Sequence, residues 1–187
     1  SKTVVARQAE PNVMLALDRS TAMAPRLGDV KAALADFLPR TTELRTALTL
    51  FPADGSSCGF SAPIPEFGNS SAAIATQVGS LTTAGDASAL DALLGARQLP
   101  DSPSREDFVL LVTSGELGCG ATTDQLVQAA KDLRQRQIRT IVVTTGATLP
   151  DATVDDRLSQ VSRAGGFVLT CPNGSAAECG EGATCGA

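Results

Sequence analysis

The residues best suited to chemistry are Asp18 and Ser20, which follow directly after the apolar run 13–17. A carboxylate and a hydroxyl on one loop are oxygen donors of the kind that Mg²⁺ prefers, although that ion takes about six such ligands. The same residue types also commonly end a strand and begin a turn, because their side chains accept hydrogen bonds from nearby backbone amides. The pair therefore leaves open both a cation site and a turn.

Enzymatic sites are excluded mainly by the absence of histidine from the 187 residues. Without this general base there is no Ser-His-Asp or Cys-His site, and a zinc site is not expected. Thr113-Ser114-Gly115 does not form a Gly-x-Ser-x-Gly elbow, and neither a P-loop nor a Gly-x-Gly-x-x-Gly motif follows the first strand. We expect a protein that is not an enzyme.

The composition suits one domain with an aliphatic core, because 43% of the residues are apolar but Trp and Tyr are absent. The net charge is −5, and no basic run alternates with aromatic residues, so nucleic acid is not an expected partner. No apolar run approaches the roughly 20 residues that cross a membrane, so no membrane span is expected either.

The hydrophobic pattern alternates between strands and helices. Continuous apolar runs indicate strands buried on both faces, whereas apolar residues at helical spacing indicate amphipathic helices. The expected strands cover 13–17, 44–51, a short edge strand near Ile64, 107–113, 138–144 and 167–170. The expected helices cover 27–38, 72–81, 88–99, 123–136 and 151–163. This order predicts an α/β fold, doubly wound, with a mostly parallel central sheet covered by helices on both faces.

One domain over 11–170 and a Cys/Gly-rich tail or linker over 171–187 are expected, because the composition changes after the last strand. In doubly wound sheets, ligands bind beyond the carboxyl ends of the strands. The relevant loops follow Leu17, Phe51 and Thr113 and precede Ser88.

All five cysteines stand in polar loops rich in Gly or Ser. Such positions favour disulfides and an oxidising compartment, with free thiols in a cytosolic protein as the alternative. Because five is an odd number, one cysteine is free or pairs elsewhere. The cysteines are Cys58, Cys119, Cys171, Cys179 and Cys185.

Three segments resemble von Willebrand factor A (VWA) and integrin I domains, and the resemblance spans roughly 11–170. Segment 13–23 resembles the opening strand and its Asp-x-Ser-x-Ser loop. Segment 85–93 resembles the Gly-Gly-Thr stretch, and segment 108–116 resembles the strand that leads into Thr-Asp-Gly. The resemblance implies a VWA/Rossmann-like sheet and a face that in this family carries a metal-ion-dependent adhesion site.

The metal site that the resemblance implies is degenerate. Ala22 and Ala87 replace two hydroxyl ligands, and Ser114 replaces a carboxylate. Asp18 and Ser20 remain as residual metal candidates. We therefore expect no metal or cofactor, with Mg²⁺ or Ca²⁺ as the alternative. Residues that remain on the implied ligand-binding face are Asp18, Ser20, Asp86, Ser88, Ser114 and Glu116.

The family's strand order also implies a disulfide. It places the first strand between the two strands that precede Cys58 and Cys119, with strands spaced about 4.8 Å apart. A Cys58–Cys119 bridge beside the site loops is therefore expected. The pairing among the three tail cysteines stays open.

The resemblance implies a non-enzymatic, adhesion-type VWA module of a bacterial envelope protein, binding a protein or cell-surface ligand without metal. Secreted bacterial members of the family include gliding-motility lipoproteins. The expected location is extracytoplasmic: cell surface, outer-membrane-attached, periplasmic or secreted. The alternative is a structural scaffold domain of an envelope or motility complex with a vestigial site. An enzyme, or a VWA subunit of a chelatase-like complex, is the third possibility. Oligomeric state stays open.

Overall fold

A computed structural model describes residues 9–41, 43–53, 58–61, 64–68, 71–86, 88–100, 102, 104–145 and 152–167. The expected boundary between domain and tail, most of the expected strand 167–170 and the three tail cysteines lie outside these residues.

The centre of the molecule is a five-stranded sheet in the order β3-β2-β1-β4-β5. The strands are β1 (Asn12–Asp18), β2 (Arg45–Phe51), β3 (Ile64–Gly68), β4 (Asp107–Thr113) and β5 (Ile138–Thr144). β1 pairs in parallel with β2 and β4, and β5 pairs in parallel with β4, while β3 is an antiparallel edge strand. The predicted doubly wound, mostly parallel sheet is thus confirmed.

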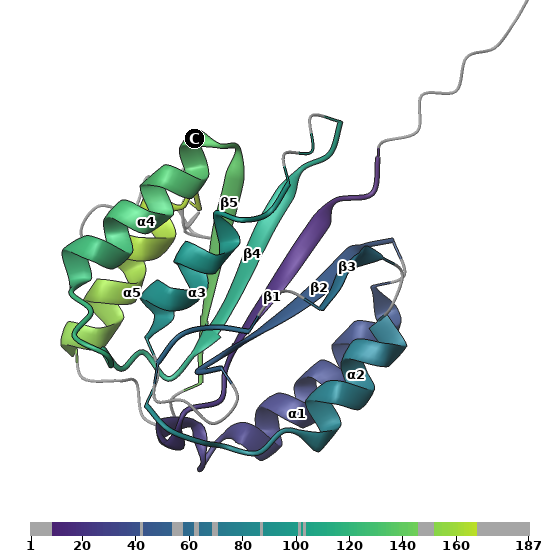
Figure 1. Cartoon of the computed structure of the whole chain (residues 1–187), viewed down its shortest axis with the longest axis horizontal. Coiled ribbons are helices and arrows are strands. Elements are labelled where there is room, and N and C mark those ends of the chain that lie inside the picture. The colour runs from purple at the N-terminus through teal and green to yellow at the C-terminus, as the bar shows by residue number, and fades with distance from the viewer. Residues whose placement is uncertain are drawn as a thin grey trace, which may run out of the picture.

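Helices cover both faces of this sheet (Figure 1). α1 (Leu27–Phe37) and α2 (Ser71–Ser80) lie on one face, and α3 (Ala89–Ala96), α4 (Thr123–Gln135) and α5 (Ala152–Ala164) lie on the other. Because successive strand residues point to opposite faces, Met14 and Ala16 join the core under α3 and α4, whereas Leu15 and Leu17 join the core under α1 and α2. A continuous apolar strand therefore serves two cores.

The predicted helices are confirmed, with ends that differ by a few residues. The helix predicted over 27–38 ends at Phe37, and a 3₁₀ turn over Leu38–Arg40 follows, in which Pro39 occupies an early position. The helix predicted over 123–136 begins after a capping box, in which Thr122 and Gln125 satisfy each other's backbone amides. It ends before Gln137, whose φ of 63° breaks helical geometry.

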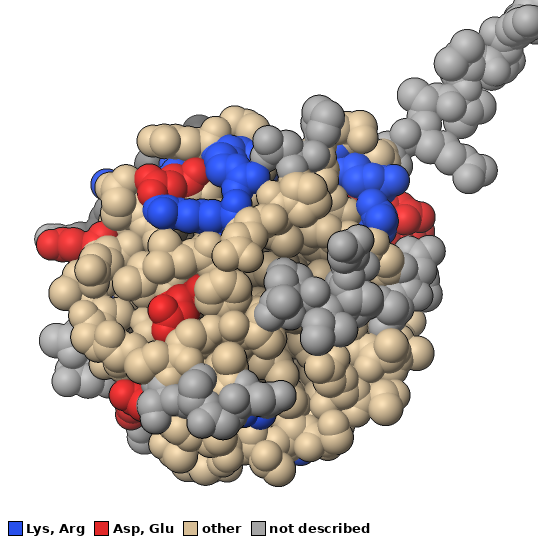
Figure 2. All heavy atoms as spheres, in the orientation of Figure 1, with Lys and Arg blue, Asp and Glu red and all other residues tan. Residues whose placement is uncertain are grey.

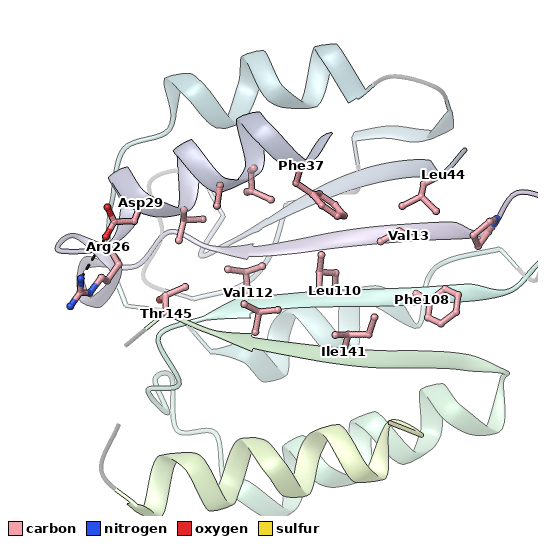
Figure 3. A pocket seen from close by; sticks show the side chains of 15 residues that line it. Val13, Arg26, Asp29, Phe37, Leu44, Phe108, Leu110, Val112, Ile141 and Thr145 are labelled. Atoms are coloured by element: carbon pink, nitrogen blue, oxygen red, sulfur yellow. Dashed lines mark ion pairs between the residues drawn. The ribbon is translucent and has the colours of Figure 1, made fainter. Parts of the chain in front are cut away.

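An apolar groove of about 800 Å³ lies between α1 and the neighbouring face of β1, β4 and β5 (Figure 3). Phe37 on α1 and Val143 on β5 line it and are each 41% exposed. In the described part of the chain, α1 therefore covers this face of β4 and β5 only partly. No helix among the described residues is both long and apolar enough to cross a membrane.

Candidate functional site

The candidate site lies at the carboxyl edge of the sheet, where β1, β2 and β4 end. Asp18, the last residue of β1, is buried, with only 2% of its surface exposed. Its Oδ1 accepts a hydrogen bond from the Ser20 amide at 2.8 Å. Its Oδ2 accepts from Thr113 Oγ1 at 3.1 Å and from both the amide and Oγ of Ser114 at 3.0 Å. The carboxylate therefore joins the end of β1 to the end of β4.

Ser20 is buried as well, at 3% exposure, and stands just before the short 3₁₀ turn Thr21–Met23. Its side chain makes no capping hydrogen bond to that turn. The hydrogen bond from its amide to the Asp18 side chain closes a turn of the kind that was considered above as the alternative to a cation site.

Neighbouring loops hold the loop after β1 on both sides. The amide and Oγ1 of Thr21 both donate to the Gly85 carbonyl, at 3.0 and 3.1 Å. The Ala84 amide donates to the Arg19 carbonyl at 2.9 Å, and Arg19 Nε donates to the Pro52 carbonyl at 3.0 Å. Three chain segments that are far apart in sequence are therefore fixed to one another.

The loop after β4 rests on α5. Gly115 has a φ of 84°, and a Cβ placed there would lie 2.5 Å from Val154 Cγ1 and 3.0 Å from Leu158 Cδ1. Arg157, on the same helix, donates from Nη1 to the Gly115 carbonyl at 2.9 Å. Sequence reasoning missed Arg157, because a charged residue in an amphipathic helix is most simply interpreted as solvated.

The expected disulfide is present at this edge. Cys58 and Cys119 are bonded, with their Cα atoms 5.9 Å apart, and they join the loops after β2 and β4 across β1. The Gly59 amide next to the bridge donates to Asp91 Oδ2 on α3 at 2.8 Å. The predicted strand order and the predicted pairing are both confirmed.

The six residues expected on the ligand-binding face do not form one cluster. Ser88 is 1% exposed and caps α3 by accepting a hydrogen bond from the Leu90 amide at 3.1 Å. Asp86 and Glu116 are exposed on adjacent loops, and neither is among the described hydrogen-bond partners of Asp18. Only Asp18, Ser20 and Ser114 are brought together, while Ala87 lies outside the described residues.

The donor set around Asp18 does not fit a Mg²⁺ ion, which takes about six oxygen ligands in octahedral geometry. Both carboxylate oxygens already accept internal hydrogen bonds, and Ala22 supplies no oxygen from its side chain. Ser114 donates its hydroxyl to Asp18 and supplies no carboxylate to the set. Among the described residues, no three acidic, cysteine or histidine side chains are grouped to hold a metal ion.

No family model and no curated protein sequence matches the chain. Solved structures do. An aerotolerance-related membrane protein from Bacteroides fragilis NCTC 9343 is 16% identical over 83% of this chain and 88% of its own, with a TM-score of 0.67. The VWA domain of SpRpn10 is 10% identical over 84% and 82%, with a TM-score of 0.62.

The pilus adhesin SpaC from Lactobacillus rhamnosus GG is 13% identical over 83% of this chain, with a TM-score of 0.68. The match spans only 27% of that larger protein. At these identities the likeness concerns the fold. Together with the strand order and the placement of Asp18 at the end of β1, it shows that the chain has the von Willebrand factor A fold.

Proposed function

We propose that the chain is a non-enzymatic recognition module of a bacterial envelope protein. In this proposal the carboxyl edge of its sheet binds a protein or cell-surface ligand without a metal ion. The observation that carries the proposal is the Asp18 carboxylate, which accepts four internal hydrogen bonds from Ser20, Thr113 and Ser114. A carboxylate used in this way holds the ends of β1 and β4 together and is not available to a ligand. In this proposal, recognition depends on the exposed groups around it.

Rigidity of the edge supports a binding role. The Cys58–Cys119 bridge and the bonds from Thr21 to Gly85 connect the loops covalently and by hydrogen bonds. A surface that is already ordered loses less conformational entropy on binding, and this makes association more favourable. Asp86 and Glu116 are exposed on the loops before α3 and after β4, and they place two acidic side chains at this edge.

The disulfide also supports an extracytoplasmic location, because structural disulfides persist mainly in oxidising compartments. Structural neighbours described as a membrane protein and a pilus adhesin agree with a place in the bacterial envelope. Neither likeness identifies a partner.

Metal independence is tested by thermal unfolding in EDTA and in a series of Mg²⁺ and Ca²⁺ concentrations. We expect the same melting temperature throughout. A reproducible increase at sub-millimolar metal, abolished by Asp18→Asn, would contradict the proposal.

Binding is tested by co-sedimentation of the protein with an isolated envelope fraction of the source bacterium, in EDTA. Glu116→Lys reverses a charge just beyond the end of β4, and Glu106→Lys makes the same change just before its beginning. We expect the first variant to reduce binding at least fivefold and the second to leave it within twofold of wild type. Equal binding by both variants would mean that the ligand contacts a surface other than the carboxyl edge.

A structural scaffold is the second candidate function. The four internal hydrogen bonds that Asp18 accepts, and the alanine at position 22, also fit an edge whose former site is vestigial. If Glu116→Lys and Glu106→Lys both keep wild-type envelope binding and stability, the scaffold interpretation is favoured.

A further inference from the structure

A second groove, of about 680 Å³, lies between α4 and α5 on the side of the fold where the strands begin. Three cations line it: Lys131 and Arg134 from α4, and Arg163 from α5. Because both helices run antiparallel to the parallel strands, their C-terminal halves lie at the edge opposite the candidate site. The groove is therefore separate from the surface proposed above.

None of these cations has an acidic partner among the residues that the structure describes. Asp132, the acid next to Lys131 in sequence, is engaged by Arg97 of α3 instead. Asp156 lies one turn before the groove on α5 and accepts a hydrogen bond from Gln160 at 2.8 Å. The local positive charge contrasts with the net charge of −5 for the whole chain.

Further cations lie toward this edge, but they have acidic neighbours. On the face drawn in Figure 2, most Lys and Arg side chains lie along the upper margin, beside the beginnings of the strands in Figure 1, with Asp and Glu side chains next to them. Arg40 and Arg97 are paired with Asp36 and Asp132. The local potential that attracts an anionic partner therefore comes from the three cations of the groove, since clustered like charges steer opposite charge.

The walls of the groove provide more than charge. Val127 and Ala164 add apolar surface, while Gln135 and Gln160 add side-chain amides. The stem of Arg134 packs over Gly166, where a Cβ would lie 3.4 Å from Cδ and Nε of that arginine. Gly166 has a φ of 91°, a backbone conformation that favours glycine, and the missing Cβ leaves room for the Arg134 side chain.

We propose that this groove binds an acidic peptide segment of a partner protein. Guanidinium groups pair with carboxylates in a bidentate manner, the glutamine amides suit a peptide backbone, and the apolar walls suit aliphatic side chains. A phosphate group alone would use the cations but not the amides or the apolar walls.

Two of the cations also have a role in their own helices. Arg134 and Arg163 stand in the last turns of α4 and α5, where cations interact favourably with the helix dipole. Lys131 precedes the last turn and is not explained in this way.

The test uses the whole chain and a fluorescein-labelled eight-residue peptide of alternating Glu and Leu, followed by fluorescence anisotropy. A peptide in which Gln replaces Glu is the chemical control. We expect saturable binding that weakens with added salt, and no binding of the Gln peptide. Absence of binding, or equal binding of both peptides, would overturn the proposal.

Variants locate the binding. Lys131→Gln/Arg134→Gln/Arg163→Gln should weaken binding at least tenfold. Lys31→Gln/Arg40→Gln/Arg139→Gln removes the same charge elsewhere and should change it less than twofold. Melting curves check folding, and the single variants Lys131→Gln and Arg163→Gln replace the triple variant if it does not fold. A purely helix-stabilising role predicts lower melting temperatures with unchanged peptide binding, which would refute the proposal.

Two further measurements separate this surface from other possibilities. Inorganic phosphate should compete only at concentrations at which chloride of equal ionic strength also competes. Selective competition by phosphate would indicate a phosphate site and contradict a peptide groove. Glu116→Lys, at the opposite edge, should leave peptide binding unchanged, so failure of the proposed function and failure of this inference are distinguishable.

Discussion

Replacing Asp18 with alanine should destabilise the fold even when no metal ion is present. The carboxylate is 2% exposed and accepts hydrogen bonds from two backbone amides and two hydroxyls. Alanine removes every one of these acceptors. A residue kept only to bind a cation would behave differently, because its removal in the metal-free protein costs little.

The magnitude follows from the donors left behind. The amides of Ser20 and Ser114 cannot turn to other acceptors; the bond from Ser20 is buried and the bond from Ser114 is partly buried. An unsatisfied buried donor costs about 1–3 kcal/mol. The two hydroxyls can rotate, so their loss adds less. We expect the free energy of unfolding to fall by about 3–5 kcal/mol, which for a domain of this size lowers the melting temperature by about 6–20 °C.

The assay is urea unfolding in EDTA, with thermal unfolding alongside it. Asp18→Asn is the matched control, because its amide oxygen can replace Oδ2 for Thr113 and Ser114, while its NH₂ faces the Ser20 amide. We expect about 1–3 kcal/mol for that variant. If Asp18→Ala lies within 1 kcal/mol of wild type, or is more stable, the structural role given to this carboxylate is wrong.

Three other substitutions test the elements that position the edge. Cys58→Ser/Cys119→Ser opens a bridge with a sequence separation of 61 and should cost about 4 kcal/mol by loop entropy, which urea unfolding would measure; an unchanged midpoint would contradict a stabilising bridge. Gly115→Ala places a Cβ 2.5 Å from an α5 side chain at positive φ and should cost about 2–4 kcal/mol. Gly120→Ala, at positive φ with open space around it, should cost only about 1 kcal/mol, so equal losses would refute the contact argument. Thr122→Ala removes the α4 cap and should cost about 1 kcal/mol in the same assay; an unchanged unfolding midpoint would contradict a stabilising cap.

Much of the architecture could be predicted because the signals are local. The apolar runs that became β1 and β4 are continuous, as strands buried on both faces must be, and Pro39 marked the end of α1 within a few residues. The short antiparallel strand β3 was predicted only approximately, near Ile64. Its five residues give too short a pattern for the bounds of the strand to be predicted from the sequence.

The candidate site was less predictable than the fold. Asp18, Ser20 and Ser114 meet because the ends of β1 and β4 are adjacent, which the resemblance implied. The capping role of Ser88 was not predicted, because sequence does not show that a hydroxyl is already used to cap a helix. Arg157 was missed because its contact with Gly115 joins residues that no local pattern connects.

The sequence by itself determined the fold class, the absence of histidine and the residue types at the ends of the strands, with alanine at position 22 and serine at position 114. These depend on residue type and periodicity, which are properties of the chain alone. Only the tertiary structure decided how the surviving carboxylate is used. Hydrogen bonds form between groups that the sheet brings together, so the donors to Asp18 from Thr113 and Ser114, 95 and 96 positions away, became visible only when β1 and β4 were placed side by side.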